Sequence, residues 1–136
     1  MRNKKIILDT NLWISFLLTK KLNQIDKLIE SKAITLIFSD ESIAEFVDVV
    51  NRSKFEKYFS KKDIESVLNY FDQFGKLIRV KSDIKLCRDK KDNFLLNLSV
   101  DSKAEYLITG DNDLLVLDKI EHTQILTFKE FIKRIG

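Results

Sequence analysis

The chain of 136 residues contains no proline, three glycines, one cysteine and one histidine. A single cysteine cannot form an internal disulfide, so a reducing cytoplasm is the simplest setting for this protein. Nucleophilic catalysis by a thiol would depend on Cys87 and His122 alone, and we set that class of enzyme aside. Apolar runs all fall short of the roughly 20 residues that a membrane-spanning helix needs, so we expect no membrane segment.

Length and composition predict one domain that spans residues 1–136. Hydrophobic residues make up 44% of the chain and charged residues 33%, which is typical of a globular protein with one core. Because no repeat, low-complexity segment or glycine- and serine-rich linker interrupts the chain, we expect no internal domain boundary.

Strand-like and helix-like patterns alternate along the chain. Apolar segments predict strands at 5–8, 33–38, 76–80, 106–109 and 123–126, and helices are expected to begin after Ser39, Ser60 and Thr127. This alternation predicts a three-layer α/β/α fold. Its centre is a mainly parallel sheet of about four or five strands, with helices on both faces.

Acidic residues stand where these elements meet. Asp9 and Asp111 each follow a strand and precede a helix, and Asp113 comes two residues later. Glu45 and Asp92 lie near the starts of two other helices. Because the binding crevice of an open parallel sheet lies beyond the carboxyl ends of its strands, these acids can converge on one site.

Each of these acids also has a purely structural interpretation. Aspartate favours the N-cap of a helix, where its oxygen accepts backbone N–H groups, so the four aspartates could all be caps. Glu45 fits a capping box that starts at Ser42. The spacing alone leaves both interpretations open.

The sequences of these motifs resemble those of the PIN-domain family of metal-dependent nucleases. The similarity begins with I-I-L-D-T-N around Asp9, continues through S-I-A-E-F around Glu45, and is closest over residues 87–115, which include I-T-G-D-N-D-L. It ends in Q-I-L-T-F-K-E-F and so covers nearly the whole chain. The chain looks most like the small prokaryotic PIN proteins that are described as toxin components of toxin–antitoxin pairs.

The resemblance implies a role for particular residues. The family's acidic positions carry over to Asp9, Glu45, Asp92 and Asp111, and Asp113 is expected to be a further catalytic acid. Three polar residues match the positions that orient the carboxylates, namely Thr10, Asn11 and Thr109. The chain departs from the family at Lys90, where relatives commonly carry proline; this change affects a turn and leaves the carboxylates in place.

The chemistry of these side chains agrees with that implication. Oxygen ligands without histidine or thiolate suit Mg²⁺ or Mn²⁺. We expect Asp9, Asp92, Asp111 and Glu45 to be the metal ligands of a ribonuclease that hydrolyses phosphodiester bonds with an activated water. The expected partners are an RNA substrate, a cognate antitoxin protein and a second copy of the chain in a homodimer.

Basic residues offer candidate contacts with RNA. The net charge of +3 is too small to identify a nucleic-acid binder. However, lysines alternate with aromatic residues over 54–61, a mixture that can hold phosphates and stack bases. The candidates are Lys54, Lys57 and Lys61, together with Arg88, Lys90 and Lys91 beside Asp92. The simpler interpretation of 54–61 is an amphipathic helical turn with a solvated lysine face and a buried aromatic face.

Three other classes of protein are weighed against the nuclease. A phosphatase of the haloacid dehalogenase type needs a second acid at the position of Asn11. A receiver domain needs a lysine after the fifth strand, where this chain has Thr127-Phe128. A non-catalytic module that binds RNA or a partner protein stays open, although retained acids would weaken pure phosphate binding.

Apolar residues of the first helix also have two interpretations. Trp13, Phe16 and Leu17 could form a surface for a dimer or an antitoxin. Packing of this helix on the sheet would bury the same residues, and we favour that interpretation.

Overall fold

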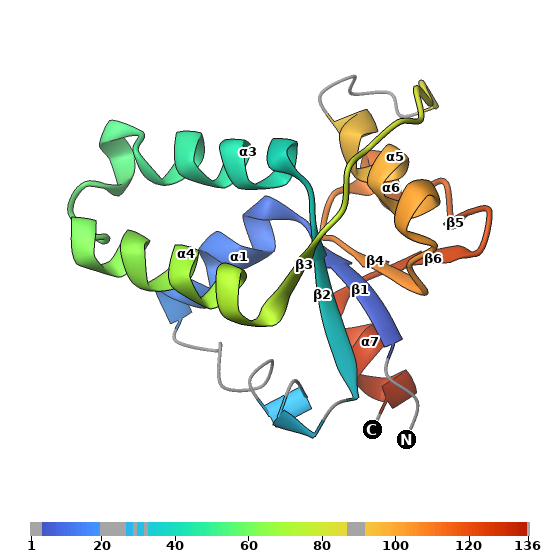
Figure 1. Ribbon diagram of the computed structural model, residues 1–136, viewed down its shortest axis with the longest axis horizontal. Coiled ribbons are helices and arrows are strands. Elements are labelled where there is room, and N and C mark those ends of the chain that lie inside the picture. The colour runs from blue at the N-terminus through green and yellow to red at the C-terminus, as the bar shows by residue number, and fades with distance from the viewer. Residues whose placement is uncertain (1–3, 20–26, 29, 32, 87–91, 136) are drawn as a thin grey trace.

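The structure is a computed structural model that describes residues 4–19, 27–28, 30–31, 33–86 and 92–135 (Figure 1). Strands and helices alternate along these residues, as the sequence predicts. The elements are β1 (Lys4–Leu8), α1 (Thr10–Thr19), β2 (Ile34–Phe38), α3 (Asp40–Val50), η1 (Ser53–Phe55), α4 (Lys61–Phe74), β3 (Gly75–Leu77), α5 (Asn93–Ser102), β4 (Tyr106–Ile108), α6 (Asn112–Leu115), β5 (Lys119–Ile120), β6 (Thr123–Leu126) and α7 (Phe128–Ile135).

Within the described residues, six strands form one sheet in the order β3-β2-β1-β4-β6-β5. All neighbouring strands are parallel except β5, which pairs antiparallel with β6. The sheet therefore has one strand more than the upper number expected. The additional strand, β5, has only two residues, too few to show a pattern in the sequence.

Helices cover both faces of the sheet and make the three layers that the sequence predicts (Figure 1). Alternate strand residues point to opposite faces. Ile6 and Leu8 of β1 pack in a core with α1, α3, α4 and α7, whereas Ile7 packs in a second core with α5 and α6. Trp13 and Phe16 are buried in the first core, which confirms that they are core residues rather than a partner surface. The side chain of Leu17 lies outside the described residues.

Local sequence sets the helix starts. The Oγ of Ser39 accepts the N–H of Ser42 and the Oγ of Ser60 accepts the N–H of Asp63, so both serines are N-caps, as predicted. In α3, Ser42 also returns a bond to Ser39, so the capping box is Ser39–Ser42. The alternative box from Ser42 to Glu45 was therefore wrong, and Glu45 is available for another role.

Strand β3 is shorter than expected, because it ends at Leu77 instead of continuing to residue 80. It begins at Gly75, where a Cβ atom would lie 2.5 Å from the ring of Phe38 and 2.7 Å from the carbonyl oxygen of Phe71. Beyond β3, the backbone N–H of Ile78 still donates to the carbonyl oxygen of Phe38 at 2.8 Å, and residues 79–86 then leave the sheet without regular structure. We call this segment the strap.

The described helices include no candidate for a membrane span, since each is too short or too polar.

Candidate active site

The site begins at the carboxyl ends of the two central strands. Leu8 of β1 is in register with Ile108 of β4, so the residues that follow them, Asp9 and Thr109, are neighbours across the sheet edge. The backbone N–H of Asp9 donates to the carbonyl oxygen of Ile108 at 3.0 Å, which fixes this position. Strand-end placement of Asp9, the basis of the prediction, is confirmed.

Thr109 joins two of the predicted acids. Its hydroxyl donates to Oδ2 of Asp9 at 2.7 Å and accepts the backbone N–H of Asp111 at 3.0 Å. Thr109 is fully buried, so this hydroxyl is held by protein groups alone. Its expected role, to orient a carboxylate, agrees with these contacts.

Asp9 carries a charge that its surroundings do not fully compensate. Only 6% of the residue is exposed. Burial raises the pKa of its carboxyl group, the nearby carboxylate of Asp111 raises it further, and hydrogen bonds from Thr109 and Asn11 lower it without reversing the shift. The Asn11 bond, from its backbone N–H to Oδ1 of Asp9, is 3.3 Å long. Ionisation of Asp9 in the folded state is therefore costly.

Glu45 reaches the same place from α3. Burial raises the pKa of its carboxyl group, and the charge of Asp9 raises it further, while a side-chain hydrogen bond with Thr10 lowers it. Asp9 is therefore the carboxylate that lies within electrostatic reach of both Glu45 and Asp111. Thr10, itself buried, links Glu45 to the start of α1.

A hollow of about 300 Å³ opens beside these carboxylates. Its lining includes Asp9, Asn11 and Asp111, which the sequence predicts, and also Leu12 and Gly110. Leu12 has no chemical signal that sequence reasoning could have used. A Cβ atom at Gly110 would meet nothing within 4 Å, so the absence of a side chain there leaves the hollow open.

Two of the predicted acids have other surroundings. Asp92 lies at the N-terminal end of α5, half-buried, and its side chain makes no capping bond to that helix. Asp113 lies in the first turn of α6 and donates its backbone N–H to Oδ1 of Asp111 at 2.9 Å. Asp111 is therefore a helix cap as well as a site residue. Convergence of Asp92 and Asp113 on the site remains a prediction.

The expected metal ligands are all carboxylates. Among the described residues, no three side chains of histidine, cysteine, aspartate or glutamate are grouped closely enough to hold a metal ion as they stand. The chemistry of the donors nevertheless fits Mg²⁺ or Mn²⁺, because the buried Asp9 and its neighbours Asp111 and Glu45 offer only carboxylate oxygens. Burial, and next to it the repulsion between carboxylates, raises the pKa of Asp9 and Glu45, and a cation would offset the cost of both effects.

The candidate RNA contacts divide into two groups. Lys54, Lys57 and Lys61 are exposed at the turn and at the start of α4. Phe59 is buried beneath them, as the amphipathic interpretation expects, but Tyr58 is 63% exposed, against that interpretation. The other three candidates, Arg88, Lys90 and Lys91, lie outside the described residues.

Comparison with known proteins identifies the family. The sequence profile of the PIN domain matches residues 5–113. The chain is 31% identical to the uncharacterized protein MJ1680 of Methanocaldococcus jannaschii over an alignment of 142 positions, which covers 95% of this chain and 90% of that protein.

Two solved structures share the fold at lower identity. VapBC2 from Rickettsia felis, crystallised with a DNA fragment from its promoter, superposes with a TM-score of 0.60 at 16% identity, covering 91% of this chain and 98% of the other. PAE2754 from Pyrobaculum aerophilum gives a TM-score of 0.55 at 13% identity, covering 98% and 89%. Together with the profile match, these similarities show that the chain belongs to the PIN-domain family, whose members are generally nucleases.

Proposed function

We propose that this protein is a metal-dependent endoribonuclease. The observation that carries the proposal is the pair Asp9 and Asp111, joined through Thr109 at the carboxyl edge of the sheet. Burial of Asp9 leaves a carboxylate with a raised pKa beside an open hollow. This combination suits a site that holds a hard cation against a phosphate group.

Each residue has a role in the proposal. Asp9, Asp92, Asp111 and Glu45 would hold Mg²⁺ or Mn²⁺, directly or through water. When bound, such a cation supplies positive charge that stabilises the phosphate and its departing 3′-oxygen and makes water more acidic. Thr109 would hold Asp9 and Asp111 in place through its hydroxyl. The side chain of Thr10 would orient Glu45, and the backbone N–H of Asn11 would orient Asp9.

Proton transfer would fall to Glu45. The pKa of Glu45 is raised by burial and by Asp9, which brings it closer to the range in which a carboxylate accepts a proton effectively. Glu45 would take a proton from the attacking water, whose oxygen forms the new bond to phosphorus as the 3′-oxygen leaves. Asp113 would help to position that water.

We propose further that the chain is the toxin component of a toxin–antitoxin pair. The support is its likeness in fold to the Rickettsia felis VapBC2 protein, together with the sequence motifs of the family. A cognate antitoxin would then bind the chain, and a homodimer is part of the same proposal. Induced expression should arrest growth, and sedimentation of the purified chain would test the dimer.

Cleavage of RNA by the purified chain tests the central proposal. We expect Mg²⁺ or Mn²⁺ to support cleavage of total RNA and excess EDTA to abolish it. The reason is that the carboxylate ligands would contribute to the reaction only through the cation that they hold. Full activity in EDTA would contradict the proposal. Binding of RNA without cleavage under any metal condition would favour the alternative, a non-catalytic module that binds RNA or a partner protein.

A further inference from the structure

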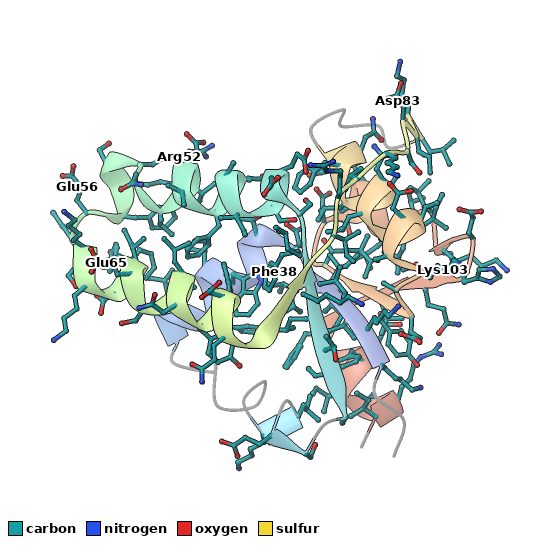
Figure 2. All side chains as sticks on the ribbon, in the orientation of Figure 1. Phe38, Arg52, Glu56, Glu65, Asp83 and Lys103 are labelled. Carbon is teal, nitrogen blue, oxygen red and sulfur yellow. The ribbon has the colours of Figure 1, made fainter. Side chains whose placement is uncertain are left out.

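A second feature of the molecule lies at the end of a helical arm, beyond Glu45 along α3. The arm consists of α3, the turn 51–60 and α4, which pack side by side and extend away from the sheet (Figure 1). Figure 2 shows Arg52, Glu56 and Glu65 at the far end of the arm and Phe38 at the sheet. Since α3 has 11 residues and a helix rises about 1.5 Å per residue, the turn lies roughly 16 Å from the start of α3.

The turn has two distinct sides. Ser53–Phe55 form the short 3-10 helix η1, and backbone bonds from Tyr58 and Phe59 to the carbonyl oxygen of Phe55 continue it as a turn. Phe55 and Phe59, four residues apart, stack at 5.8 Å and pack toward the first core. Lys54, Lys57 and Tyr58 have the spacing that places three residues on one side of a helical turn. We call these three residues the tip face.

The tip face is exposed, positively charged and aromatic. Tyr58 is 63% exposed, although tyrosine is a large side chain that usually buries part of its ring. Both lysines are exposed, and among the described residues neither forms an ion pair. Lys54 lies over the ring of Phe55, with its Nζ atom 5.1 Å from the ring centre.

Two acidic residues of the arm have partners outside the tip face. Asp48 pairs with Arg52 at 3.1 Å, and the carboxylate of Asp63 accepts the backbone N–H of Ser60 at 2.9 Å. Glu56 and Glu65 line a separate hollow, beside Phe59 and Lys61. The tip face itself therefore presents two positive charges and one exposed aromatic ring.

We propose that the tip face is a second binding site for single-stranded RNA, separate from the hollow beside Asp9 and Asp111. Lys54 and Lys57 would contact phosphates, and Tyr58 would stack on an unpaired base. A strand that reached both the tip face and the acid site would have to be several nucleotides long. The inference rests on the proposed ribonuclease function for its substrate, and it adds a preference for longer strands.

Binding measurements in EDTA test the inference without cleavage. The probe is a fluorescent oligouridylate of about 15 nucleotides, within the range of lengths that single-strand sites bind, and anisotropy is followed as salt increases. Lys54→Ala/Lys57→Ala should weaken binding and make the dependence of log K on log salt shallower by about 0.7 for each lost phosphate contact. Tyr58→Ala should weaken binding about tenfold at unchanged slope, and Tyr58→Phe should restore it.

The control variant is Lys129→Ala/Lys133→Ala, which removes the same charge from exposed positions on α7. It should bind the probe more tightly than the tip-face double variant does. Equal binding by the two double variants, or no loss in Tyr58→Ala, would overturn the inference.

Parallel cleavage assays separate this inference from the proposed function. Tip-face variants should cleave a trinucleotide as the wild type does but require more of a long RNA to reach half-maximal rate. If the wild type does not cleave RNA while the tip-face variants still lose binding, the ribonuclease proposal fails and the tip face stands. If the wild type cleaves and the tip-face variants bind normally, the tip face fails alone.

Discussion

Asp9, at the carboxyl edge of the sheet, and Asp101, in the last turn of α5, are both hydrogen-bonded aspartates, yet their pKa values move in opposite directions. Burial raises the pKa of Asp9, and hydrogen bonds from Thr109 and Asn11 do not offset it. Burial also acts to raise the pKa of Asp101. There, however, hydrogen bonds from Ser82 and Lys81 outweigh burial and lower it.

The difference separates a structural carboxylate from one suited to chemistry. Asp101 accepts the backbone N–H groups of Lys81 and Ser82 and the hydroxyl of Ser82, and one turn earlier Asn97 accepts the N–H of Ile84 at 2.6 Å. These bonds hold the strap against α5. Asp9 instead keeps an uncompensated charge beside Asp111, a cost that a bound cation would remove.

The two aspartate-to-asparagine variants should differ most in catalysis. Asp9→Asn removes a ligand charge while keeping the side-chain size, so RNA cleavage in Mn²⁺ should fall by about 100-fold or more, the scale of losing one group that stabilises the transition state. Asp101→Asn is the matched control and should cleave nearly as the wild type does at a temperature where it is folded. Equal losses in both variants would mean that Asp9 acts only through the fold.

In stability, by contrast, Asp101→Asn should be the more strongly affected variant. Asp101→Asn weakens hydrogen bonds to a charged acceptor and should lower the free energy of unfolding by about 2 kcal/mol. Asp9→Asn relieves repulsion with Asp111 and Glu45, so in metal-free buffer it should be at least as stable as the wild type. Urea denaturation of the two variants measures both effects, and a large loss of stability in Asp9→Asn would contradict the comparison.

The same denaturation series at different pH values sharpens the contrast. Because the folded pKa of Asp9 is raised, its stabilising contribution is present below the unfolded pKa and is lost as pH rises through the folded value. Because the folded pKa of Asp101 is lowered, its contribution is present above the unfolded pKa and is lost as pH falls through the folded value. Asp9→Asn should thus reduce the loss of stability as pH is raised, and Asp101→Asn should reduce the loss of stability as pH is lowered. Because the pKa of Glu45 is also raised, the stability of Asp9→Asn should still fall somewhat as pH is raised.

Much of the fold follows from local sequence. Short continuous apolar runs in β1 and β4, and capping serines at residues 39 and 60, predict the main elements because burial and backbone hydrogen bonding act over a few residues. The pattern does not predict β5, which has two residues and follows Asp118 in a left-handed conformation at φ 65°. The early end of β3 also depends on distant contacts, since the strap is held by α5.

The site could be predicted in part for the same reason. Strand-end positions place Asp9 and Asp111 correctly, since parallel strands end at one edge. The link through Thr109 joins residues 100 positions apart, and only the register of β1 and β4 reveals it. Likewise, Asp101 gives no signal in the sequence, because its partners lie 19 and 20 residues earlier on a segment without regular structure.

The central claim is that the carboxylate of Asp9 binds a divalent cation, and thermal unfolding with and without Mn²⁺ tests it without any substrate. A cation that binds only the folded protein stabilises it, by about 2.7 kcal/mol at a concentration 100 times its dissociation constant. Mn²⁺ should raise the Tm of the wild type and of Asp101→Asn by similar amounts and leave that of Asp9→Asn nearly unchanged. An equal rise in Asp9→Asn, or no rise in the wild type, would contradict the account.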